Sequence, residues 1–516
     1  MTKARREIVL RGGCLFLIVL LGCLLRLYGL GRLPAGLNQD EASEFYEAFC
    51  LLHGGADRNG VGNPVQFISW GSGQNVAYAW LCLPFFKLLG ASATVGRLPM
   101  ALVGCASILV FYGLARQWFG DRVSLLYAAA FAFAPWHIAK SRWALESNLF
   151  PDLILLGVFL ISCYLQRRRP GWLLGAAAVF AFSLYSYGTA YLFVPLFLLP
   201  AGLFLLLHEK TPPRHALAAC ALLAVLALPI FLFVLINRFG WPAIQTPFFT
   251  IPLLYVNRSN SIFSLFAGGG AAATLRGNAA AVWHCLLGAG DGLAANSTPG
   301  FTVFYPWLLP FTALGFLAGL LRPARQEYLL HFWALAAAIT ALFVKFNVNR
   351  ANILWIPIIY YTARGLAVLP KWSKALGGGA LAVGLALFCR SYFSPAYQAQ
   401  LGQAFFYGYE DCLKAAEAAT TGDIYVTDSI EQPYISYLFW DKVPPKTYRE
   451  QAVKEDAYSA FEKVVQIGRY HFTLPKDGTQ LASGSALIVT PDEAQALAGQ
   501  NGTRQDFGNY VLLLTP

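Results

Sequence analysis

The stretch Gly12-Gly-Cys-Leu-Phe-Leu-Ile-Val-Leu-Leu-Gly-Cys-Leu-Leu-Arg-Leu-Tyr-Gly-Leu30 decides the class of fold, because Arg26 is its only charged residue. Crossing ~30 Å of hydrocarbon takes about 20 apolar residues in a helix. Basic residues between Lys3 and Arg11 precede the run, as they precede the apolar core of a signal peptide. This run is longer than such a core, and no small-x-small cleavage site closes it. We therefore predict a first membrane helix that the protein retains.

Apolar runs of similar length recur through most of the chain. Further runs begin near Val95, Leu125, Leu149, Trp172, Tyr191, Ala216, Trp307, Leu329, Asn352 and Ala375, which gives about eleven predicted spans. Of the 516 residues, 57% are hydrophobic and only 13% are charged, whereas roughly a quarter are charged in soluble proteins. The composition predicts a mainly α-helical, polytopic membrane bundle rather than a soluble enzyme with an anchor.

The basic residues predict the orientation of this bundle, because they gather in alternate connections between the runs. These connections carry Lys3, Arg5, Arg6, Arg11, Arg116, Arg122, Arg167, Arg168, Arg169, Lys210, Arg214, Arg322, Arg325, Arg364, Lys371 and Lys374. The positive-inside rule then places the N-terminus in the cytoplasm and, with an odd number of spans, the C-terminus outside the plasma membrane. One side of the membrane thus accounts for the net charge of +11, and no nucleic-acid partner is expected.

The long connections all fall on the predicted external side, where function is expected. A first loop covers residues 31–94, and its segments Asn38–Leu52 and Val76–Leu89 are each predicted to form a helix lying at the membrane surface. A second long loop covers residues 237–305. We predict two domains, a membrane domain of residues 1–390 and an external soluble domain of residues 391–516.

The external C-terminal domain is predicted to be a small α/β domain. Strand-like runs occur at Asp423–Thr427, Ala486–Thr490 and Asn509–Leu514, which suggests three strands. Helical patterns separate them at Glu410–Ala419 and Tyr448–Lys463.

Asp40 and Glu41 are the strongest candidates for catalysis, because two adjacent carboxylates follow the first membrane helix. There they can meet both lipid headgroups and external water. A structural alternative exists for Glu41, since Asn38 with Glu41 three residues later has the spacing of a capping box. On position alone, catalysis and capping explain this pair about equally well.

A second group of candidates lies in the predicted external turn before the fourth run. Arg142 and Glu146 have the i, i+4 spacing of a surface ion pair, and Asp152 follows Pro151 in the first turns of the next helix. Ionisable residues near membrane depth usually face the protein interior, which makes these residues candidates for substrate binding or, for Glu146 and Asp152, metal binding. His137 is a further candidate metal ligand, although a lone histidine is more often structural.

A polar, basic cluster in a later external turn contains Lys345, Asn349 and Arg350. Basic residues at the end of a membrane helix often have no binding role and simply extend their charged groups toward water. A cationic patch at the level of the outer headgroups is also what a lipid phosphate would need. These residues are therefore predicted to contact a lipid phosphate or its sugar.

The pattern resembles the GT-C superfamily of glycosyltransferases, in particular the dolichyl-phosphate-mannose protein mannosyltransferases and the lipid A aminoarabinose transferases. Leu33-Pro-Ala-Gly-Leu-Asn-Gln-Asp-Glu-Ala42 is similar to the Asp-Glu signature that follows the first helix in these enzymes. Gly96-Arg-Leu-Pro-Met-Ala-Leu102 and Arg142-Trp-Ala-Leu-Glu146 extend the likeness. The resemblance covers about residues 20 to 370 and does not include the predicted external domain of residues 391–516.

The resemblance implies an inverting transfer of sugar from a polyprenyl-phosphate donor to an acceptor hydroxyl, on a protein or a glycan. Asp40 would be the general base, supported by Glu41, and Arg350, Arg142 or a divalent cation would stabilise the leaving phosphate. Aminoarabinose transferases carry an acid later in the first loop that is implicated in metal binding. Gly71-Ser-Gly-Gln-Asn75 stands at the comparable place without a carboxylate, so the need for a metal is left open.

Two other functions compete with this interpretation. A transporter is expected to show matching interrupted helices in two halves of the chain, and the sequence shows no such repeat. An O-antigen ligase or polymerase would also use a lipid-linked donor, but it needs no Asp-Glu pair after the first helix.

Overall fold

The computed structural model describes residues 3–257, 270–475, 481–497 and 503–515, and the chain forms two compact units. The first unit comprises Met1–Tyr28, Leu98–Phe231 and Ser259–Tyr397. The second unit comprises Gly29–Arg97, Leu232–Arg258 and Gln398–Pro516. These units do not coincide with the expected division at residue 390, because the first loop packs with the C-terminal region in the second unit.

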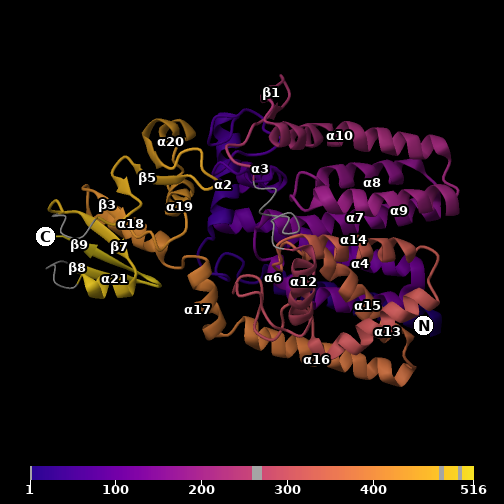
Figure 1. The fold of residues 1–516 in the computed structure, drawn as a ribbon. Coiled ribbons are helices and arrows are strands. Elements are labelled where there is room, and N and C mark those ends of the chain that lie inside the picture. Colours follow the sequence, from indigo (N-terminus) through magenta and orange to yellow (C-terminus); the bar gives the residue numbers. More distant parts are fainter. Residues whose placement is uncertain (1–2, 258–269, 476–480, 498–502, 516) are drawn as a thin grey trace. The chain divides into compact units, whose positions relative to one another are not determined.

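The first unit is helical (Figure 1). Its helices are α1 (Lys3–Leu27), most of α4 (Ala93–Phe119), α5 (Asp121–Ala132), α6 (Pro135–Lys140), α7 (Glu146–Arg167), α8 (Pro170–Ser183), α9 (Ala190–Leu203), the π-helix η1 (Phe204–His208), most of α10 (Pro213–Phe239), α12 (Ala271–Leu286), η3 (Pro306–Leu308), α13 (Leu309–Leu321), α14 (Tyr328–Phe343), η4 (Asn352–Leu354), α15 (Trp355–Val368) and α16 (Lys371–Tyr392). Every apolar run expected from the sequence lies in one of these helices.

Among the residues that the structure describes, six helices are long and apolar enough to cross a membrane, so the chain is a multi-pass membrane protein. They are Arg5–Leu27, Ala93–Phe119, Glu146–Arg167, Ala190–His208, Pro213–Phe239 and Ala375–Tyr392. The other expected spans form shorter helices, such as α5 with 12 residues and α8 with 14. Since about 20 residues cross the hydrocarbon layer, the number of eleven spans stays a prediction.

Close packing between α13 and α15 depends on two glycines. A Cβ atom on Gly315 would lie 1.8 Å from the carbonyl oxygen of Tyr361, and one on Gly365 would lie 1.8 Å from that of Phe311. Small residues let membrane helices approach in this way. The backbones of these two helices are therefore in direct contact.

The expected loop 237–305 contains regular structure that the sequence did not predict. It holds a short hairpin of β1 (Ile244–Gln245) and β2 (Thr250–Ile251), and it holds helix α12. The side-chain amide of Asn278 in α12 donates hydrogen bonds to the carbonyl oxygens of Leu342 and Val344, at 2.7 and 2.8 Å. Asn278 interrupts the apolar pattern of α12, and its hydrogen bonds to residues of another segment explain why a polar side chain stands there.

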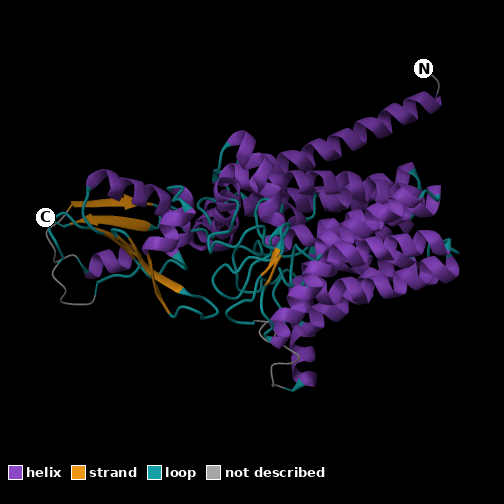
Figure 2. Cartoon of the chain, turned by 90° about the horizontal axis from the view of Figure 1, so that it is seen from above, coloured by secondary structure: helices purple, strands orange, loops and turns teal. Residues whose placement is uncertain are grey.

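The second unit combines the first-loop helices with a seven-stranded sheet, and strands are concentrated here (Figure 2). Its helices are α2 (Gln39–Gly54), α3 (Ala77–Leu89), most of α17 (Pro395–Ala404), α18 (Tyr409–Ala419), α19 (Pro433–Trp440), α20 (Pro445–Gln451) and α21 (Pro491–Ala496). Its strands are β3 (Ile424–Val426), β4 (Ala452–Glu455), β5 (Lys463–Ile467), β6 (Tyr470–His471), β7 (Ala486–Val489), β8 (Thr503–Phe507) and β9 (Tyr510–Leu514).

The strands of the sheet follow one another in the order β4-β5-β6-β3-β7-β9-β8. The three strands predicted from the sequence are β3, β7 and β9, which are neighbours in this sheet. Strand β3 pairs with β7 in parallel, and β7 pairs with β9 in antiparallel fashion. Strand β7 is buried along its whole length. The predicted helix at 410–419 is also confirmed, because α18 covers these residues.

The predicted helix at Tyr448–Lys463 is wrong. Helix α20 ends at Gln451, and β4 and β5 follow as an antiparallel pair. Side chains of β4 alternate between half-buried and exposed, which is the period of a strand. Asp456 and Tyr458 have positive φ angles of 50° and 74°, so the connection between the strands cannot be helical.

Candidate functional site

Asp40 lies in the first turn of α2, where a capping box fixes the backbone. The side-chain oxygen of Asn38 accepts a hydrogen bond from the backbone N–H of Asp40 at 3.0 Å. The carboxylate of Glu41 in turn accepts one from the backbone N–H of Asn38 at 3.4 Å. The predicted capping box is confirmed. It satisfies backbone donors that the start of a helix leaves without partners.

Glu41 has a second role, because it forms a buried ion pair with Arg97. Nε and Nη2 of Arg97 donate to the two carboxylate oxygens of Glu41 at 2.9 and 2.7 Å, and both side chains have no exposed surface. Arg97 also donates to the carbonyl oxygens of Pro34 and Gly36, each at 2.8 Å. Glu41 is thus fixed by a guanidinium group, whereas its neighbour Asp40 is half-buried.

Helix α2 was predicted to lie at the membrane surface, but most of its acidic side chains are buried inside the second unit. Glu44 and Glu47 have no exposed surface. Glu47 is paired with Arg58, whose Nε lies 3.2 Å from a carboxylate oxygen of Glu47. Arg58 also donates to the hydroxyl of Ser69 at 2.7 Å. A buried charge needs such partners, so α2 is held along its acidic side as well as its apolar side.

Gln74 connects α2 to the loop stretch 71–75, which carries no carboxylate. Its amide nitrogen donates to the backbone carbonyl of Asp40 at 3.3 Å. Its amide oxygen accepts from the hydroxyls of Ser43 and Ser69 at 2.5 and 3.2 Å. This stretch therefore supports the backbone at Asp40 through a neutral amide.

Residues of the C-terminal region also hold α2 within the second unit. The side-chain amide of Asn38 donates to the carbonyl of Ala404 at 3.1 Å, and that of Gln39 donates to Glu431 at 2.8 Å. The hydroxyl of Tyr46 donates to the carbonyl of Val443 at 3.0 Å. The C-terminal region is thus part of the support of Asp40, which its distance along the chain did not suggest.

In the first unit, Arg142 binds the end of α1. Its guanidinium group donates to the carbonyl oxygens of Leu25 and Tyr28 at 2.9 and 2.8 Å and lies near the rings of Tyr392 and Phe393. The last carbonyls of a helix need such partners. Arg142 is fully buried, and Glu146, in the first turn of α7, is half-buried.

Asp152, His137, Lys140 and Arg26 form a buried network. The ammonium group of Lys140 donates to Asp152, and Nε2 of His137 lies 3.1 Å from the same carboxylate. Nδ1 of His137 lies 2.6 Å from a guanidinium nitrogen of Arg26, which can only donate. His137 therefore accepts at Nδ1 and donates to Asp152 from Nε2. Burial lowers the pKa of His137 to about 3, which keeps the ring neutral.

This network does not fit a metal centre, although His137 and Asp152 were candidate ligands. Both ring nitrogens of His137 are occupied, and Asp152 is neutralised by Lys140. Among the described residues, no group of three or more His, Cys, Asp or Glu side chains is placed to hold a metal ion. We therefore assign this network to the packing of α1, α6 and α7.

We expect Asp152→Asn to destabilise the protein by about 3 kcal/mol, because it leaves the buried ammonium group of Lys140 without its counter-charge. Thermal unfolding of the detergent-solubilised protein measures this loss. Asp506→Asn is the control, since it removes a charge from the exposed Arg504–Asp506 pair and is expected to cost at most about 1 kcal/mol. Equal unfolding midpoints for both variants would contradict the assignment.

The cluster around Arg350 is an ordered turn in the first unit. Asp291 accepts hydrogen bonds from the backbone N–H of Val348 at 2.9 Å and from the side chain of Asn296 at 2.6 Å, and Asn349 donates to Asn296. Lys345 is exposed, and Arg350 and Asn349 are half-buried. The guanidinium group of Arg350 donates to the carbonyl of Lys345 at 3.2 Å.

The structure places the candidate residues in both units. Asp40 and Glu41 belong to the second unit, and Arg142, Glu146, Asp152, His137, Lys345, Asn349 and Arg350 belong to the first. Within the first unit, Asn352 donates to the carbonyl of Ser147, so the turn around Arg350 meets the start of α7 next to Glu146.

Sequence reasoning missed several charged residues that hold the candidates in place. These are Arg97, Arg58, Lys140, Arg26 and Asp291. Each of them is a charged residue in a stretch with few other charges, and this pattern does not identify the partner of the charge.

The fold combines an N-terminal membrane helix, a capped carboxylate-bearing helix after it, a bundle of apolar helices and a terminal α/β region. Crystal structures of ArnT from Cupriavidus metallidurans share this fold. The form bound to undecaprenyl phosphate aligns with a TM-score of 0.61 and 15% identity over 97% of this chain and 98% of that chain. The apo form aligns with a TM-score of 0.59 and 14% identity over 99% and 98%.

Two further comparisons agree with this fold. Residues 74–253 match the family described as dolichyl-phosphate-mannose-protein mannosyltransferase, a segment that includes Arg142 and Glu146 but begins after Asp40. The Archaeoglobus fulgidus oligosaccharyltransferase in complex with Zn and sulfate aligns with a TM-score of 0.50 and 13% identity over 83% of this chain and 61% of that chain. No curated protein sequence matches this chain. The resemblance to the GT-C superfamily is confirmed.

Proposed function

We propose that the protein transfers a sugar from a polyprenyl-phosphate donor to an acceptor hydroxyl on the external face of the membrane, with inversion. The observation that carries this proposal is the contrast between two adjacent acids. Arg97 holds Glu41 in a fully buried ion pair, whereas Asp40 lies half-buried in the first turn of α2. A general base must be reached by the acceptor, and the side chain of Asp40 keeps some exposed surface whereas that of Glu41 keeps none.

The proposed step exchanges one C–O bond for another. Asp40 takes the proton of the acceptor hydroxyl while that oxygen attacks the anomeric carbon of the donor. The bond between this carbon and the phosphate oxygen breaks from the opposite side, which inverts the configuration. The polyprenyl phosphate leaves with the bonding electron pair, and we assign the stabilisation of its charge to Arg350 and Arg142.

A lipid-linked donor is favoured by the placement of polar sequence and by the structural relatives. In the proposed orientation the cytoplasmic connections are short, so they offer no domain for a nucleotide-sugar. The ArnT structure with the same fold contains undecaprenyl phosphate. The acceptor is a protein or a glycan of the cell envelope.

Mass spectrometry of cell-envelope glycans and glycoproteins tests the proposal directly. We expect one sugar modification to disappear when the protein is removed and to return with the wild-type chain but not with a chain altered at Asp40. An unchanged envelope together with accumulation of a small solute would favour transport instead.

We expect Arg350→Ala to weaken donor use by at least tenfold, because a cation at a phosphate contributes about 1.5–3 kcal/mol. Steady-state kinetics with varied donor and varied acceptor would show a raised KM for the donor and an unchanged KM for the acceptor. Arg390→Ala is the control, since Arg390 is an exposed arginine at the end of α16. An unchanged KM for the donor would contradict this role and would indicate that the Arg350 side chain only extends toward water.

The orientation is a separate prediction, since it rests on the positive-inside rule. We expect a membrane-impermeant thiol reagent applied outside intact cells to label Ser429→Cys but not Arg169→Cys. Both positions are exposed on their own units, so accessibility within the protein does not limit labelling. The reverse labelling pattern would overturn the proposed orientation.

A further inference from the structure

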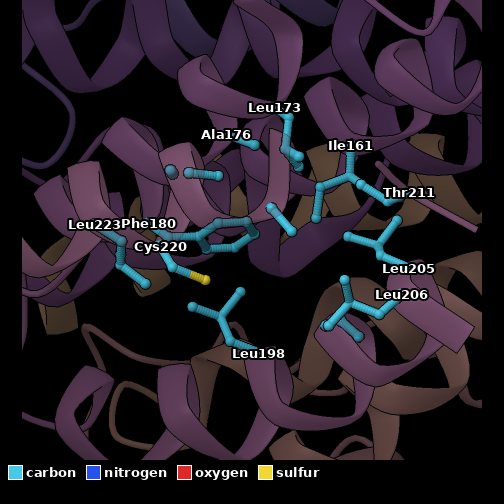
Figure 3. Close-up of a pocket in the computed structure, with 15 residues that line it drawn as sticks. Ile161, Leu173, Ala176, Phe180, Leu198, Leu205, Leu206, Thr211, Cys220 and Leu223 are labelled. Atoms are coloured by element: carbon cyan, nitrogen blue, oxygen red, sulfur yellow. The ribbon is translucent and has the colours of Figure 1, made fainter. Parts of the chain in front are cut away.

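Helices α7, α8, α9 and α10 of the first unit, together with η1, enclose an apolar groove (Figure 3). Its volume is about 130 Å³, close to the ~150 Å³ of an apolar protein cavity that holds benzene. The groove runs along α10 from Ala216 to Leu223, which is about 10 Å at the rise of a helix. Leu206 and Cys220 in its wall are exposed, so the groove is open on one side.

The lining is hydrocarbon with two exceptions, the sulfur of Cys220 and the hydroxyl of Thr211. Thr211 is 3% exposed. Its hydroxyl has no hydrogen-bond partner within the part of the chain that the structure describes. A buried hydroxyl without a partner is costly, so a ligand that accepts a hydrogen bond at this point would be favoured.

The groove ends next to basic residues. Lys210 precedes Thr211, Arg214 lies one half-turn before Ala216, and both basic side chains are exposed. Arg168 is the C-cap residue after α7 and donates to the carboxylate of Glu209 at 2.9 Å. Glu209 also pairs with Arg325 at 2.8 Å, so this carboxylate is shared between two arginines. The mouth of the groove is therefore cationic.

The apolar lining, the hydroxyl of Thr211 and the basic side chains follow one another in the same order as the acyl chain, the ester group and the phosphate of a phospholipid. We propose that the groove binds one acyl chain of an anionic phospholipid. The ester carbonyl of the lipid accepts a hydrogen bond from Thr211, and its phosphate lies near Lys210 and Arg214. A polyprenyl phosphate has no acyl chain and no carboxylic ester carbonyl, and none of the residues assigned to sugar transfer lines this groove, so the proposal does not rest on the proposed function.

Native mass spectrometry of the full-length protein tests this site with phosphatidylglycerol and phosphatidylcholine of identical acyl chains, supplied in equal amounts. We expect the wild-type protein to retain one phosphatidylglycerol. Gly202→Leu should reduce retention at least tenfold, because Gly202 lines the groove and has space for a Cβ atom. Gly378→Leu, at an equally open glycine of α16, should retain the lipid as the wild type does.

Two further variants test the polar end of the site. Thr211→Val keeps the shape of the side chain and should weaken retention about fivefold, the effect of one hydrogen bond. The double variant Lys210→Gln/Arg214→Gln should remove the preference for phosphatidylglycerol over phosphatidylcholine. Bound lipid should also slow maleimide labelling of Cys220, with Cys14 as the exposed reference thiol.

Three results would overturn the proposal. One is equal retention of phosphatidylglycerol by Gly202→Leu and Gly378→Leu. Another is equal retention of both phospholipids by the wild-type protein. The third is retention of a polyprenyl phosphate in place of a phospholipid, with loss in Gly202→Leu.

Discussion

The Asp40→Asn protein is expected to fold normally, to bind the donor lipid and to transfer sugar about 10²–10⁴-fold more slowly than the wild type. Asparagine keeps the size of the side chain and removes its basicity. The capping box does not use the carboxylate of Asp40, since Asn38 and Glu41 supply the capping side chains. Transfer of radiolabelled sugar by the purified, reconstituted protein measures the loss.

The chain contains a matched control for this variant. Helix α21 begins with Thr490-Pro-Asp-Glu493, a second capping box in which Asp492 occupies the same helix position as Asp40. Asp492→Asn therefore makes the same chemical change at an equivalent, exposed helix start and should leave transfer unchanged. Near-normal turnover of Asp40→Asn would overturn the assignment and would favour a ligase-type or polymerase-type reaction.

The second large effect is expected for the pair Glu41–Arg97. Glu41→Gln leaves the guanidinium group of Arg97 buried without its counter-charge, which costs about 3–5 kcal/mol. Arg97→Met leaves Glu41 and the carbonyls of Pro34 and Gly36 without their donor and should cost at least as much. We expect a clear fall in the thermal unfolding midpoint of the solubilised protein in both cases.

A double variant separates the pair from its surroundings. Glu41→Gln/Arg97→Met should lose less stability than the sum of the single variants, because neither charge is then left unpaired. Arg97→Lys should rescue only part of the loss, since an ammonium group cannot bind both carboxylate oxygens and two carbonyls in the same geometry. If Glu41→Gln unfolds normally but loses transfer as Asp40→Asn does, Glu41 takes part in the chemistry itself.

Local pattern was sufficient to predict the helices and the central strands. Each apolar run became a helix, and β3, β7 and β9 were predicted from short runs of β-branched and apolar residues. The strands β4, β5 and β8 were missed because they carry charged or polar residues, and β6 was missed because it has only two residues. Strand β8, for example, is exposed over most of its length. An edge strand is stabilised by pairing with its neighbour, which its own sequence does not reveal.

The sequence by itself determined that this is a membrane bundle and that Asp40 and Glu41 follow its first helix. Both conclusions depend on spacing along the chain, which is a local property. Only the tertiary structure decided that Glu41 is paired with Arg97, because the two residues lie 56 positions apart in the chain. In the same way, only the fold joined Asp152 to Lys140 and His137 and Arg58 to Glu47. A buried charge must find a partner, but which partner it finds depends on how the chain packs.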